Sequence, residues 1–297
     1  MSRVLICGTL AYDDIGEFDT PWSDGLRNVK LTRLHRGFGG CAMNLAYNLT
    51  GLGHVAVPFV YVGDDYPGDY ARHVAGHAIS EAGVFQIQGT PCARGIVLTG
   101  PHGVQFTAFY PGPSGLERWR DDLDPLLERG GFDAVIIAAD LPQKMAGCAR
   151  RTAHLPLRIW SPGQYAEMLS AEDVAPHLAC GGWLVASRHE WQALLALRPA
   201  TEWQAAFEQI VITDGAHAVQ VLPEGETHPV PAPPRVVDPT GCGDAFTAAL
   251  VAARLNGAPL ATSVQAGIRL AGRCLGHAGA QCHAVDVGVL SGRPTTG

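Results

Sequence analysis

The sequence lacks any long apolar run and carries little charge of either sign. No stretch reaches the roughly 18 consecutive apolar residues that a membrane-spanning helix requires. Charged residues make up 16% of the chain, the formal net charge is −7, and no cluster rich in lysine or arginine is present. Binding to a phosphate backbone needs a basic surface, so nucleic acid is excluded as the main partner. We therefore expect neither a membrane nor a nucleic-acid partner, whereas small anionic ligands are compatible with this composition.

Targeting and metal-binding patterns are also missing. Residues 4–7 form a strand-like run close to the N-terminus, with no signal-peptide cleavage region beside it. The eight cysteines are dispersed without a Cys-x-x-Cys pair, which predicts buried thiols and not a zinc or redox centre. These features indicate a cytoplasmic protein. Its 297 residues, 47% of them hydrophobic, are enough for one large domain or two modest ones.

Short apolar runs alternate with helical patterns along most of the chain. The runs expected to form buried strands are residues 4–7, 55–62, 134–138, 157–160, 183–186 and 210–213. The expected helices cover residues 42–52, 69–81, 116–127, 143–154, 190–197, 245–255 and 263–275. This alternation predicts an α/β fold with a mostly parallel sheet between two helical layers, and ligands at the carboxyl ends of its strands.

Two segments, residues 10–36 and 85–110, interrupt this alternation. The second has alternating residues at 95–98 and 104–109 around a glycine- and proline-containing turn at 100–103, which predicts a β-hairpin. Pairing of the two segments would give a small sheet that acts as a lid and excludes water from a reactive donor. We expect a single domain over residues 1–297 with this lid inserted.

The sequence DPTGCGD at residues 238–244 places a glycine-rich turn at the start of an apolar helix. Gly241 and Gly243 let an anion approach the unpaired amides of the helix N-terminus. Asp244 is near the positive end of the helix dipole, so it should be ionised at neutral pH and can accept a hydroxyl proton. A simple helix start would also explain the glycines, but the paired aspartates favour phosphoryl transfer. Cys242 is either unusually acidic and easily alkylated or merely a small residue in the turn.

Another glycine cluster, GFGGCAMNLA at residues 37–46, leads into the helix expected at 42–52. We call it the first glycine cluster because it comes earlier in the chain. Gly39 and Gly40 would let a ligand lie against the main chain, and Asn44 offers a donor and an acceptor to hydroxyl groups. Close packing of helix against sheet, with Asn44 solvated, explains the cluster equally well.

Together with the predicted lid, these two motifs resemble the signature pair of the pfkB or ribokinase-like kinases, which transfer phosphate from ATP to a hydroxymethyl group. The resemblance extends from residue 4 to about residue 281 and implies a ribokinase-like three-layer sandwich with a small β-sheet lid. It implies ATP as donor, Mg²⁺, Asp244 as the catalytic base, and an anion hole from the amides of Gly241, Cys242 and Gly243. The family usually has alanine in place of Cys242. A monovalent cation such as K⁺ near Asp238 is common in the family, but nothing in the sequence indicates it.

Several local strings look more like bacterial adenosine kinases than like sugar kinases. Asp13, in the string GTLAYD at residues 8–13, matches an aspartate that binds ribose hydroxyls, and the resemblance places Gly39, Gly40 and Asn44 beside it. The alternative is that Asp13 caps a turn. A carboxylate that accepts two hydrogen bonds suits a ribose diol.

Two further strings concern the base. Phe109, within residues 106–112, matches an aromatic residue that covers the base, and Gln164, within residues 161–165, matches a glutamine at the base edge. Phe109 could instead fill the core of the lid, and Gln164 could be an exposed loop residue. Arg94 occupies a position that adenosine kinases also fill with arginine, where it would support the lid or reach phosphate; we favour support.

The chain departs from the family pattern at two places. The family's Asn-x-x-Glu pair, which organises water around magnesium, reads Ser187 to Glu190 here, so we expect weakened or rearranged metal binding. Glu190 could also be a plain surface residue. Thr213 and Gly215 match the nucleotide loop, where Ala218 replaces a second glycine and is tolerated if its φ stays negative.

Our first hypothesis is therefore an ATP- and Mg²⁺-dependent kinase for the 5′-hydroxyl of adenosine or a related purine nucleoside. The alternatives are a sugar kinase of the ribokinase or fructokinase type, and a non-catalytic protein that senses a nucleoside or nucleotide. A homodimer paired through the edge of the strand expected at residues 95–98 of the lid and a monomer are both compatible with the sequence.

Overall fold

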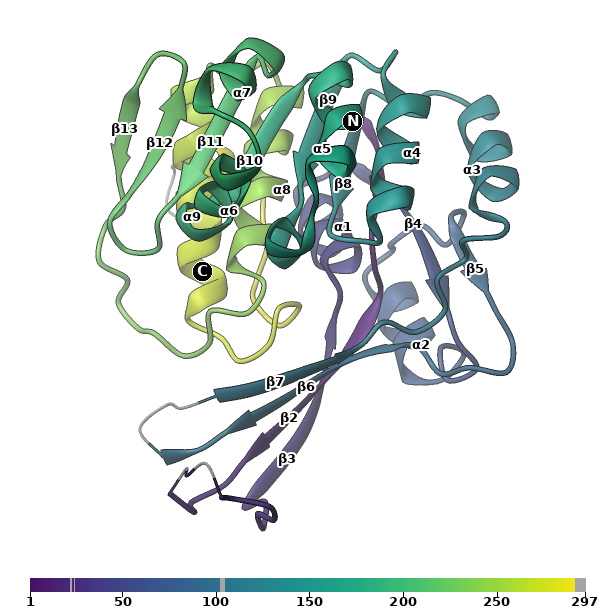
Figure 1. The fold of residues 1–297 in the computed structure, drawn as a ribbon, viewed down its shortest axis with the longest axis vertical. Helices are drawn as coiled ribbons and strands as arrows, with labels where there is room; N and C mark the ends of the chain where they lie inside the picture. The colour runs from purple at the N-terminus through teal and green to yellow at the C-terminus, as the bar shows by residue number, and fades with distance from the viewer. Residues whose placement is uncertain (22, 24, 102–104, 292–297) are drawn as a thin grey trace.

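Two β-sheets organise the chain in the computed structural model, which describes residues 1–21, 23, 25–101 and 105–291 (Figure 1). The larger sheet has nine strands in the order β13-β12-β11-β10-β9-β8-β1-β4-β5. Its strands are β1 (Arg3–Cys7), β4 (Val55–Val62), β5 (Val84–Gln86), β8 (Ala134–Ala138), β9 (Leu157–Ser161), β10 (Trp183–Ser187), β11 (Gln209–Thr213), β12 (Ala218–Leu222) and β13 (Glu226–Pro229). Neighbours from β11 to β5 are parallel, while β12 and β13 add antiparallel at one edge. The parallel strands are apolar almost throughout because helices cover both of their faces.

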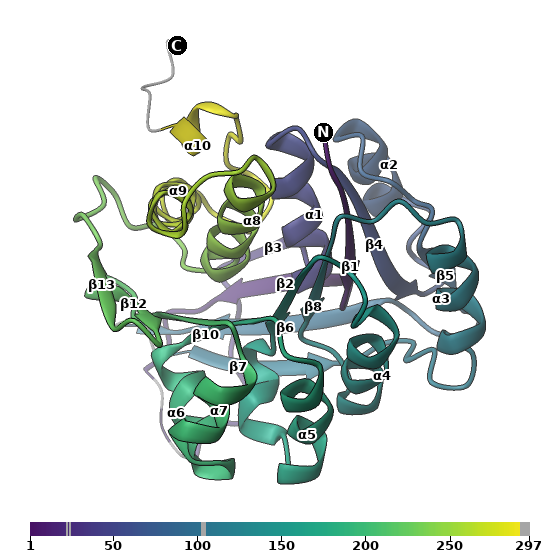
Figure 2. The same cartoon turned by 90° about the horizontal axis from the view of Figure 1, so that it is seen from above.

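Helices form one layer on each face of this sheet (Figure 2). The first layer holds α1 (Cys41–Gly51), α2 (Asp69–Gly76), α8 (Cys242–Leu255), α9 (Leu260–Leu275) and the short α10 (Gly288–Ser291). The second holds α3 (Trp119–Glu128), α4 (Pro142–Thr152), α5 (Ala171–Cys180), α6 (Arg188–Leu197) and α7 (Ala200–Ala206). Each layer packs its own hydrophobic core against the sheet. The predicted three-layer α/β architecture is confirmed.

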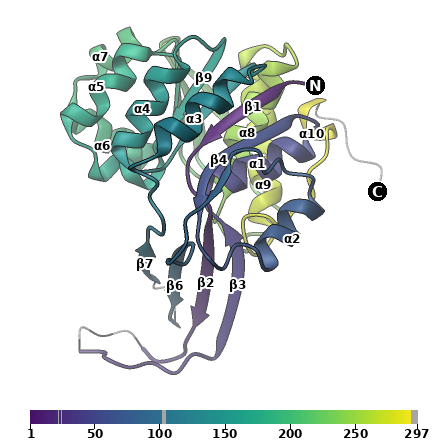
Figure 3. The ribbon, with the colours of Figure 1, turned by 90° about the vertical axis from the view of Figure 1, so that its right-hand side faces the viewer.

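A second sheet of four strands extends away from the main body (Figures 1 and 3). Its order is β3 (Arg33–Gly39), β2 (Ala11–Glu17), β6 (Ala93–Thr99) and β7 (Gln105–Tyr110). β2 pairs antiparallel with β3 and parallel with β6, and β6 pairs antiparallel with β7. The strands of this small sheet come from the two predicted lid segments and the first glycine cluster. Part of the predicted hairpin turn, residues 102–104, lies outside the described residues.

The predicted second lid segment begins too early. Residues 85 and 86 belong to β5, which pairs with β4 at the edge of the large sheet. The reason is aromatic packing, since the Phe85 ring lies 5.7 Å from that of Phe59 and 5.9 Å from that of Tyr61. This part of the chain is therefore held in the main body.

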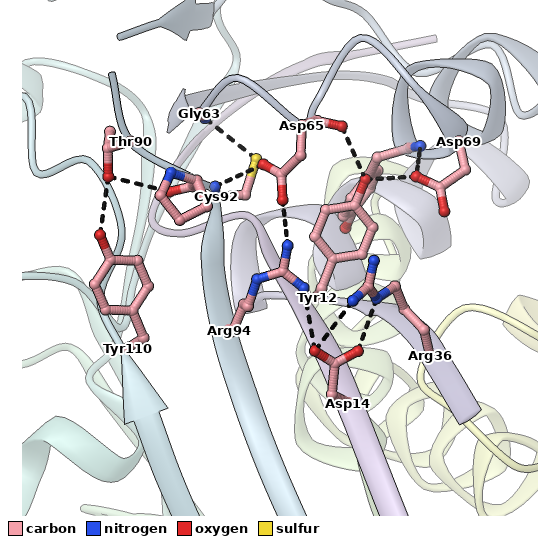
Figure 4. A network of polar contacts seen from close by, with 12 residues as sticks. Tyr12, Asp14, Arg36, Gly63, Asp65, Asp69, Thr90, Cys92, Arg94 and Tyr110 are labelled. Carbon is pink, nitrogen blue, oxygen red and sulfur yellow. Dashed lines mark hydrogen bonds and ion pairs between the residues drawn. The ribbon is translucent and has the colours of Figure 1, made fainter. Parts of the chain in front are cut away.

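A polar network joins the small sheet to the segment before α2 (Figure 4). Arg94 on β6 pairs with Asp14 on β2 at 3.1 Å and also with Asp65. The Tyr12 hydroxyl donates to Asp69 Oδ1 at 2.5 Å. Of the two roles open to Arg94, this geometry fits support of the small sheet.

Two remaining expectations concern cysteines and membranes. The thiols are free, but Cys282 is exposed, and Cys41, Cys180 and Cys242 are only partly buried, so the expectation of uniformly buried thiols was wrong. Within the described ranges, no helix combines the length and apolar character needed to cross a membrane.

Candidate active site

The glycine-rich turn at residues 238–244 leads directly into α8. Gly241 precedes the helix with φ 78°, and a Cβ there would lie 2.4 Å from the Cβ of Ala280, so both backbone and packing require glycine. This left-handed residue lets α8 begin at Cys242, three residues before the predicted start at 245, so Asp244 lies within the first turn.

The backbone amides at this helix end are only partly free. The Cys242 amide donates to the Pro239 carbonyl at 3.2 Å, so it is not available to an anion as we had expected. Within the described part of the chain, the amides of Gly241, Gly243 and Asp244 have no hydrogen-bond acceptor. These three amides at the positive end of the helix dipole can hold an anionic oxygen.

Asp238 fixes the position of this turn against the segment that follows α9. Its Oδ1 accepts from the Thr240 amide and its Oδ2 from the Gly279 amide, both at 2.9 Å. The carboxylate therefore holds the two loops on either side of the α8 N-terminus together.

The Asp244 carboxyl faces the first glycine cluster. Asn44 Nδ2, from α1, donates to Asp244 Oδ2 at 2.8 Å. Burial raises the pKa of Asp244 to about 7; the hydrogen bond from Asn44 opposes this, and the charges of Glu190 and Asp13 add to it. Burial thus opposes the ionisation that we expected from the position of Asp244 at the start of the helix. A carboxyl with a pKa near the working pH is well matched to general base catalysis.

Asp13 lies in the middle of β2 and does not cap a turn. Two glycines flank its carboxylate, and neither position has room for a side chain. A Cβ at Gly39 would lie 2.1 Å from Asp13 Oδ2, and one at Gly95 would lie 2.8 Å from Oδ1. Burial, with the nearby charges of Asp238 and Asp14, raises the pKa of Asp13 to about 6. The glycines thus make space around a carboxylate whose own charge is poorly compensated by the protein.

The first glycine cluster carries the chain from β3 into α1. Gly40 has φ 85°, and a Cβ there would lie 2.5 Å from the Ala11 nitrogen, so glycine is required. Asn44 is 5% exposed, which contradicts its interpretation as a solvated residue. Its Oδ1 accepts from Gln281 Nε2 at 2.9 Å while its Nδ2 donates to Asp244. Both polar atoms predicted to meet a ribose therefore already have protein partners.

A pocket of about 150 Å³ lies between the small sheet and the ends of β1 and β8. Phe109, 42% exposed, and Tyr165 line it. The predicted Gln164 is exposed and is not part of the lining, which its neighbour Tyr165 provides. The pocket also contains the buried ion pair of Lys144 Nζ with Asp140 Oδ2, at 2.6 Å.

Ser187 and Glu190 form a capping box at the start of α6. The Glu190 amide donates to Ser187 Oγ at 3.2 Å, and the Ser187 amide donates to Glu190 Oε2 at 2.8 Å. Glu190 is therefore more than a plain surface residue, because it orders this helix end and its charge also reaches Asp244.

The predicted nucleotide loop is a tight turn between β11 and β12. Thr213 ends β11, and Gly215 has φ 53° with open space where a Cβ would be. Ala218 begins β12 and is not among the residues with positive φ, so the replacement of glycine there is tolerated as expected.

Sequence reasoning missed Lys144, Asp140 and Gln281. The ion pair had a signal, since Asp140 stands two residues after the end of the strand at 134–138 and Lys144 stands one helical turn later. Gln281 gave none, because its contact with Asn44 spans 237 positions.

The whole arrangement matches one family of known proteins. The model of the pfkB family carbohydrate kinases matches residues 3–285, nearly the entire chain. The chain belongs to the pfkB family. It is thus a phosphotransferase that acts on hydroxyl groups, and the ribokinase-like fold is shared by solved members of the family.

Three relatives of this pfkB protein illustrate the likeness. The structure of Burkholderia thailandensis nucleoside kinase in complex with inosine is 25% identical, with a TM-score of 0.85 over 97% of this chain and 96% of that one. Methanocaldococcus jannaschii nucleoside kinase, an archaeal member of the ribokinase family, is 21% identical over 86% of this chain and 85% of its own length. Thermotoga maritima ribokinase has a TM-score of 0.81 at 19% identity, covering 98% of this chain and 99% of that one.

Proposed function

We propose that this pfkB protein is a nucleoside kinase that transfers the γ-phosphoryl group of ATP to the 5′-hydroxyl of a purine nucleoside such as adenosine. The observation that carries the proposal is the contact of Asp244 with Asn44, beside the free amides at the N-terminus of α8. It brings a base of raised pKa to an anion-binding helix end. The names of the Burkholderia and Methanocaldococcus relatives support a nucleoside as acceptor.

The chemistry follows from the positions of these groups. Asp244, when ionised, accepts the proton of the 5′-hydroxyl as that oxygen bonds to the γ-phosphorus and the bond to the β-phosphate oxygen breaks, which releases ADP. The amides of Gly241 and Gly243 stabilise the negative charge on the transferred group. Asp13, with room left by Gly39 and Gly95, accepts hydrogen bonds from the ribose hydroxyls and orients the nucleoside.

The acceptor's base fits the pocket beneath Phe109. An aromatic face from Phe109 or Tyr165 suits a planar ring, and the Lys144 ammonium and Asp140 carboxylate offer a donor and an acceptor at its edge. A buried ion pair in the lining of a pocket costs desolvation, so a role in ligand recognition would explain it. This combination favours a nucleoside over a bare sugar.

The residues present fit a Mg²⁺ ion held mainly by the nucleotide. Among the described residues, no group of three or more histidine, cysteine or acidic side chains is arranged to hold a metal. Mg²⁺ usually keeps several waters and binds substrate phosphates with one or two carboxylates, and when bound it neutralises phosphate charge. Glu190 Oε1, which accepts no hydrogen bond from the described residues, could accept one from a metal-bound water, and Ser187 Oγ lies beside Glu190. Thr213 and Gly215 would border ATP. Turnover in KCl against NaCl tests whether K⁺ is also required.

We further propose a homodimer formed through the small sheet. Its outer strands are β3 and β7, so the strand at residues 95–98, which belongs to β6, is internal and is not the free edge that we had expected. Leu34 and Ile96 expose apolar side chains on this sheet. Edge strands pair readily with a second copy. Sedimentation should give the mass of a dimer, and Leu34→Lys should shift it to that of a monomer; a monomeric wild-type protein would contradict the proposal.

One panel tests the proposed function. ATP consumption is measured with adenosine, inosine, guanosine, cytidine, ribose and fructose, for the wild type and for Asp244→Asn. Purine nucleosides should be turned over with the highest kcat/KM, and Asp244→Asn should lose at least about a thousandfold in kcat. Higher kcat/KM with ribose or fructose would make the protein a sugar kinase. Tight nucleoside binding without turnover of any acceptor would make it a sensor.

A further inference from the structure

A chain of buried side chains reaches Asp244 from the segment that follows α9. Gln281, 3% exposed, donates from Nε2 to Asn44 Oδ1 at 2.9 Å and to the Tyr70 hydroxyl oxygen at 3.1 Å. Gln281 Oε1 lies 2.8 Å from His73 Nε2. Asn44 Nδ2 then donates to Asp244 Oδ2. These hydrogen bonds thus connect α1, α2, α8 and the segment after α9.

The direction of every bond in this chain is determined by its partners. The Tyr70 hydroxyl donates to the Gly39 carbonyl at 2.6 Å, so it must accept from Gln281. Both hydrogens of Gln281 Nε2 are then used, and its Oε1 must accept from a protonated His73 Nε2. Burial lowers the pKa of His73, which keeps its ring neutral at neutral pH with this single donor.

The same reasoning fixes the amide of Asn44. The oxygen and nitrogen ends of an asparagine are nearly equal in shape, so hydrogen-bond partners decide its orientation. An ionised Asp244 only accepts, and Gln281 Nε2 only donates; the two partners therefore select the same orientation of Asn44. Without Gln281, the amide of Asn44 would lose the partner that holds its Oδ1 away from the carboxylate.

We propose that Gln281 is a positioning residue for phosphoryl transfer, which orients Asn44 so that its amide donates to the catalytic carboxylate of Asp244. This rests on the proposed role of Asp244 as base. Through Tyr70, Gln281 also fixes the carbonyl of Gly39, whose Cα lies against the Asp13 carboxylate. Gln281 thus links the base to the strand that carries the substrate-side glycine.

The test compares two buried contacts between the same two segments. His283 Nε2 lies 2.8 Å from Asn48 Oδ1, one helical turn further along α1, and both side chains are buried. This pair also joins α1 to the segment after α9, but it does not contact Asp244. His283→Leu is therefore the control for Gln281→Met, because each removes a buried polar side chain that joins α1 to the segment after α9. Gln281→Met removes three hydrogen bonds, and His283→Leu removes one.

The expected result is a change in the pH dependence of kcat/KM for the preferred nucleoside. Gln281→Met should lower kcat about tenfold with little change in KM, since an interaction with a charged group is weakened. It should also move the acid limb to higher pH, because a poorly held Asn44 stabilises ionised Asp244 less. His283→Leu should also lose thermal stability but keep the wild-type acid limb.

The other groups facing Asp244 stay unchanged in both variants; they are Glu190 on α6, Asp13 on β2, Cys41 on α1, Cys242 on α8 and Cys274 on α9. Gln281→Glu gives a second measurement if the methionine variant folds poorly. Its carboxylate would attract the amide of Asn44 and turn Oδ1 towards Asp244, so the acid limb should shift further than with methionine.

A double-mutant cycle assigns the pathway. If Gln281 acts through Asn44, adding Gln281→Met to Asn44→Leu should change kcat by less than about twofold. Full additivity, or an acid limb in Gln281→Met equal to that of His283→Leu, would overturn the proposal. Retention of wild-type turnover by Asp244→Asn would instead overturn the role of Asp244 as base, and a wild-type preference for ribose or fructose would overturn the proposed function, so these failures are distinguishable.

Discussion

The raised pKa of Asp244 predicts that this residue destabilises the fold at neutral and basic pH. Its pKa lies above the value of 3.8 that an aspartate has when unperturbed, at about 7. Between these values the folded protein binds more protons than the unfolded chain, so unfolding free energy falls as pH rises through this window and levels off above it. Asp244→Asn removes the charge and keeps the shape, so we expect it to be inactive but more stable than the wild type at pH 8.

The magnitude follows from the size of the pKa change. At 1.36 kcal/mol for each pH unit, the full difference would be about 4 kcal/mol. Asp244 as a whole residue is only partly buried, so solvent screens part of this energy. We therefore expect about 1–2 kcal/mol, or a rise in Tm of about 2–6 °C. The gain should be largest at pH 8, shrink steadily below pH 7 and vanish near pH 4.

Thermal unfolding of both proteins at pH 4.5, 6 and 8 checks this. Asp69→Asn is a control of opposite sign, because the hydrogen bond from Tyr12 lowers the pKa of Asp69 and its removal should cost stability at pH 8. The reasoning would be refuted if Asp244→Asn were no more stable than the wild type at pH 8, or if its gain in stability did not change with pH.

Three further predictions concern the substrate site. Phe109→Ala should raise KM for nucleosides about tenfold and leave any turnover of ribose unchanged, as measured by ATP consumption; equal losses for both would remove Phe109 from base recognition. The contact with the Cys274 thiol lowers the pKa of Cys242, so iodoacetamide should alkylate this thiol and inactivate the wild type. ATP should protect the wild type, and Cys242→Ala should stay active and resist inactivation by iodoacetamide. Asp13 has a pKa of about 6 and gains hydroxyl donors on binding, so nucleoside affinity should rise from pH 5 to 7 with proton release at pH 6. Calorimetry in two buffers measures that release, and its persistence in Asp13→Asn would contradict the assignment.

Much of the fold could be predicted because its elements have strong local signals. The six predicted strands are present with ends within one residue, since buried parallel strands read as continuous apolar runs. Helices α5 and α7 were missed for physical reasons. α5 contains Pro176, and α7 spans only seven residues after Pro199, which is too short for a periodic pattern. Both are stabilised by tertiary packing, as the fully buried Trp203 shows for α7.

The candidate site was predictable where chemistry is local and unpredictable where it depends on contacts. The glycines at 39, 40 and 241 could be found because backbone conformation and close approach leave a mark on the sequence. The hydrogen-bond partner of Asn44 could not be predicted from the sequence, because Asp244 stands 200 positions away. The burial that raises the pKa of Asp244 could not be predicted for the same reason, since burial is a property of the assembled layers and not of the turn.

Two carboxylates of the small sheet differ in whether the protein supplies partners for their negative charge. This difference distinguishes the structural carboxylate from the functional one. Asp13 and Asp14 are neighbours on β2, and alternation along a strand turns them to opposite faces. Asp14 meets Arg36 and Arg94, and their hydrogen bonds and charges lower its pKa; the protein itself satisfies it. Asp13 meets glycines and the negative charge of Asp238, and its pKa is raised. A carboxylate that the fold leaves uncompensated needs hydrogen-bond donors from outside the protein, and the hydroxyl groups of a substrate are such donors. Burial likewise raises the pKa of Asp244, although Asn44 donates to it, so the fold holds both acids proposed to meet the acceptor, at its ribose and at its 5′-oxygen, at a cost in stability.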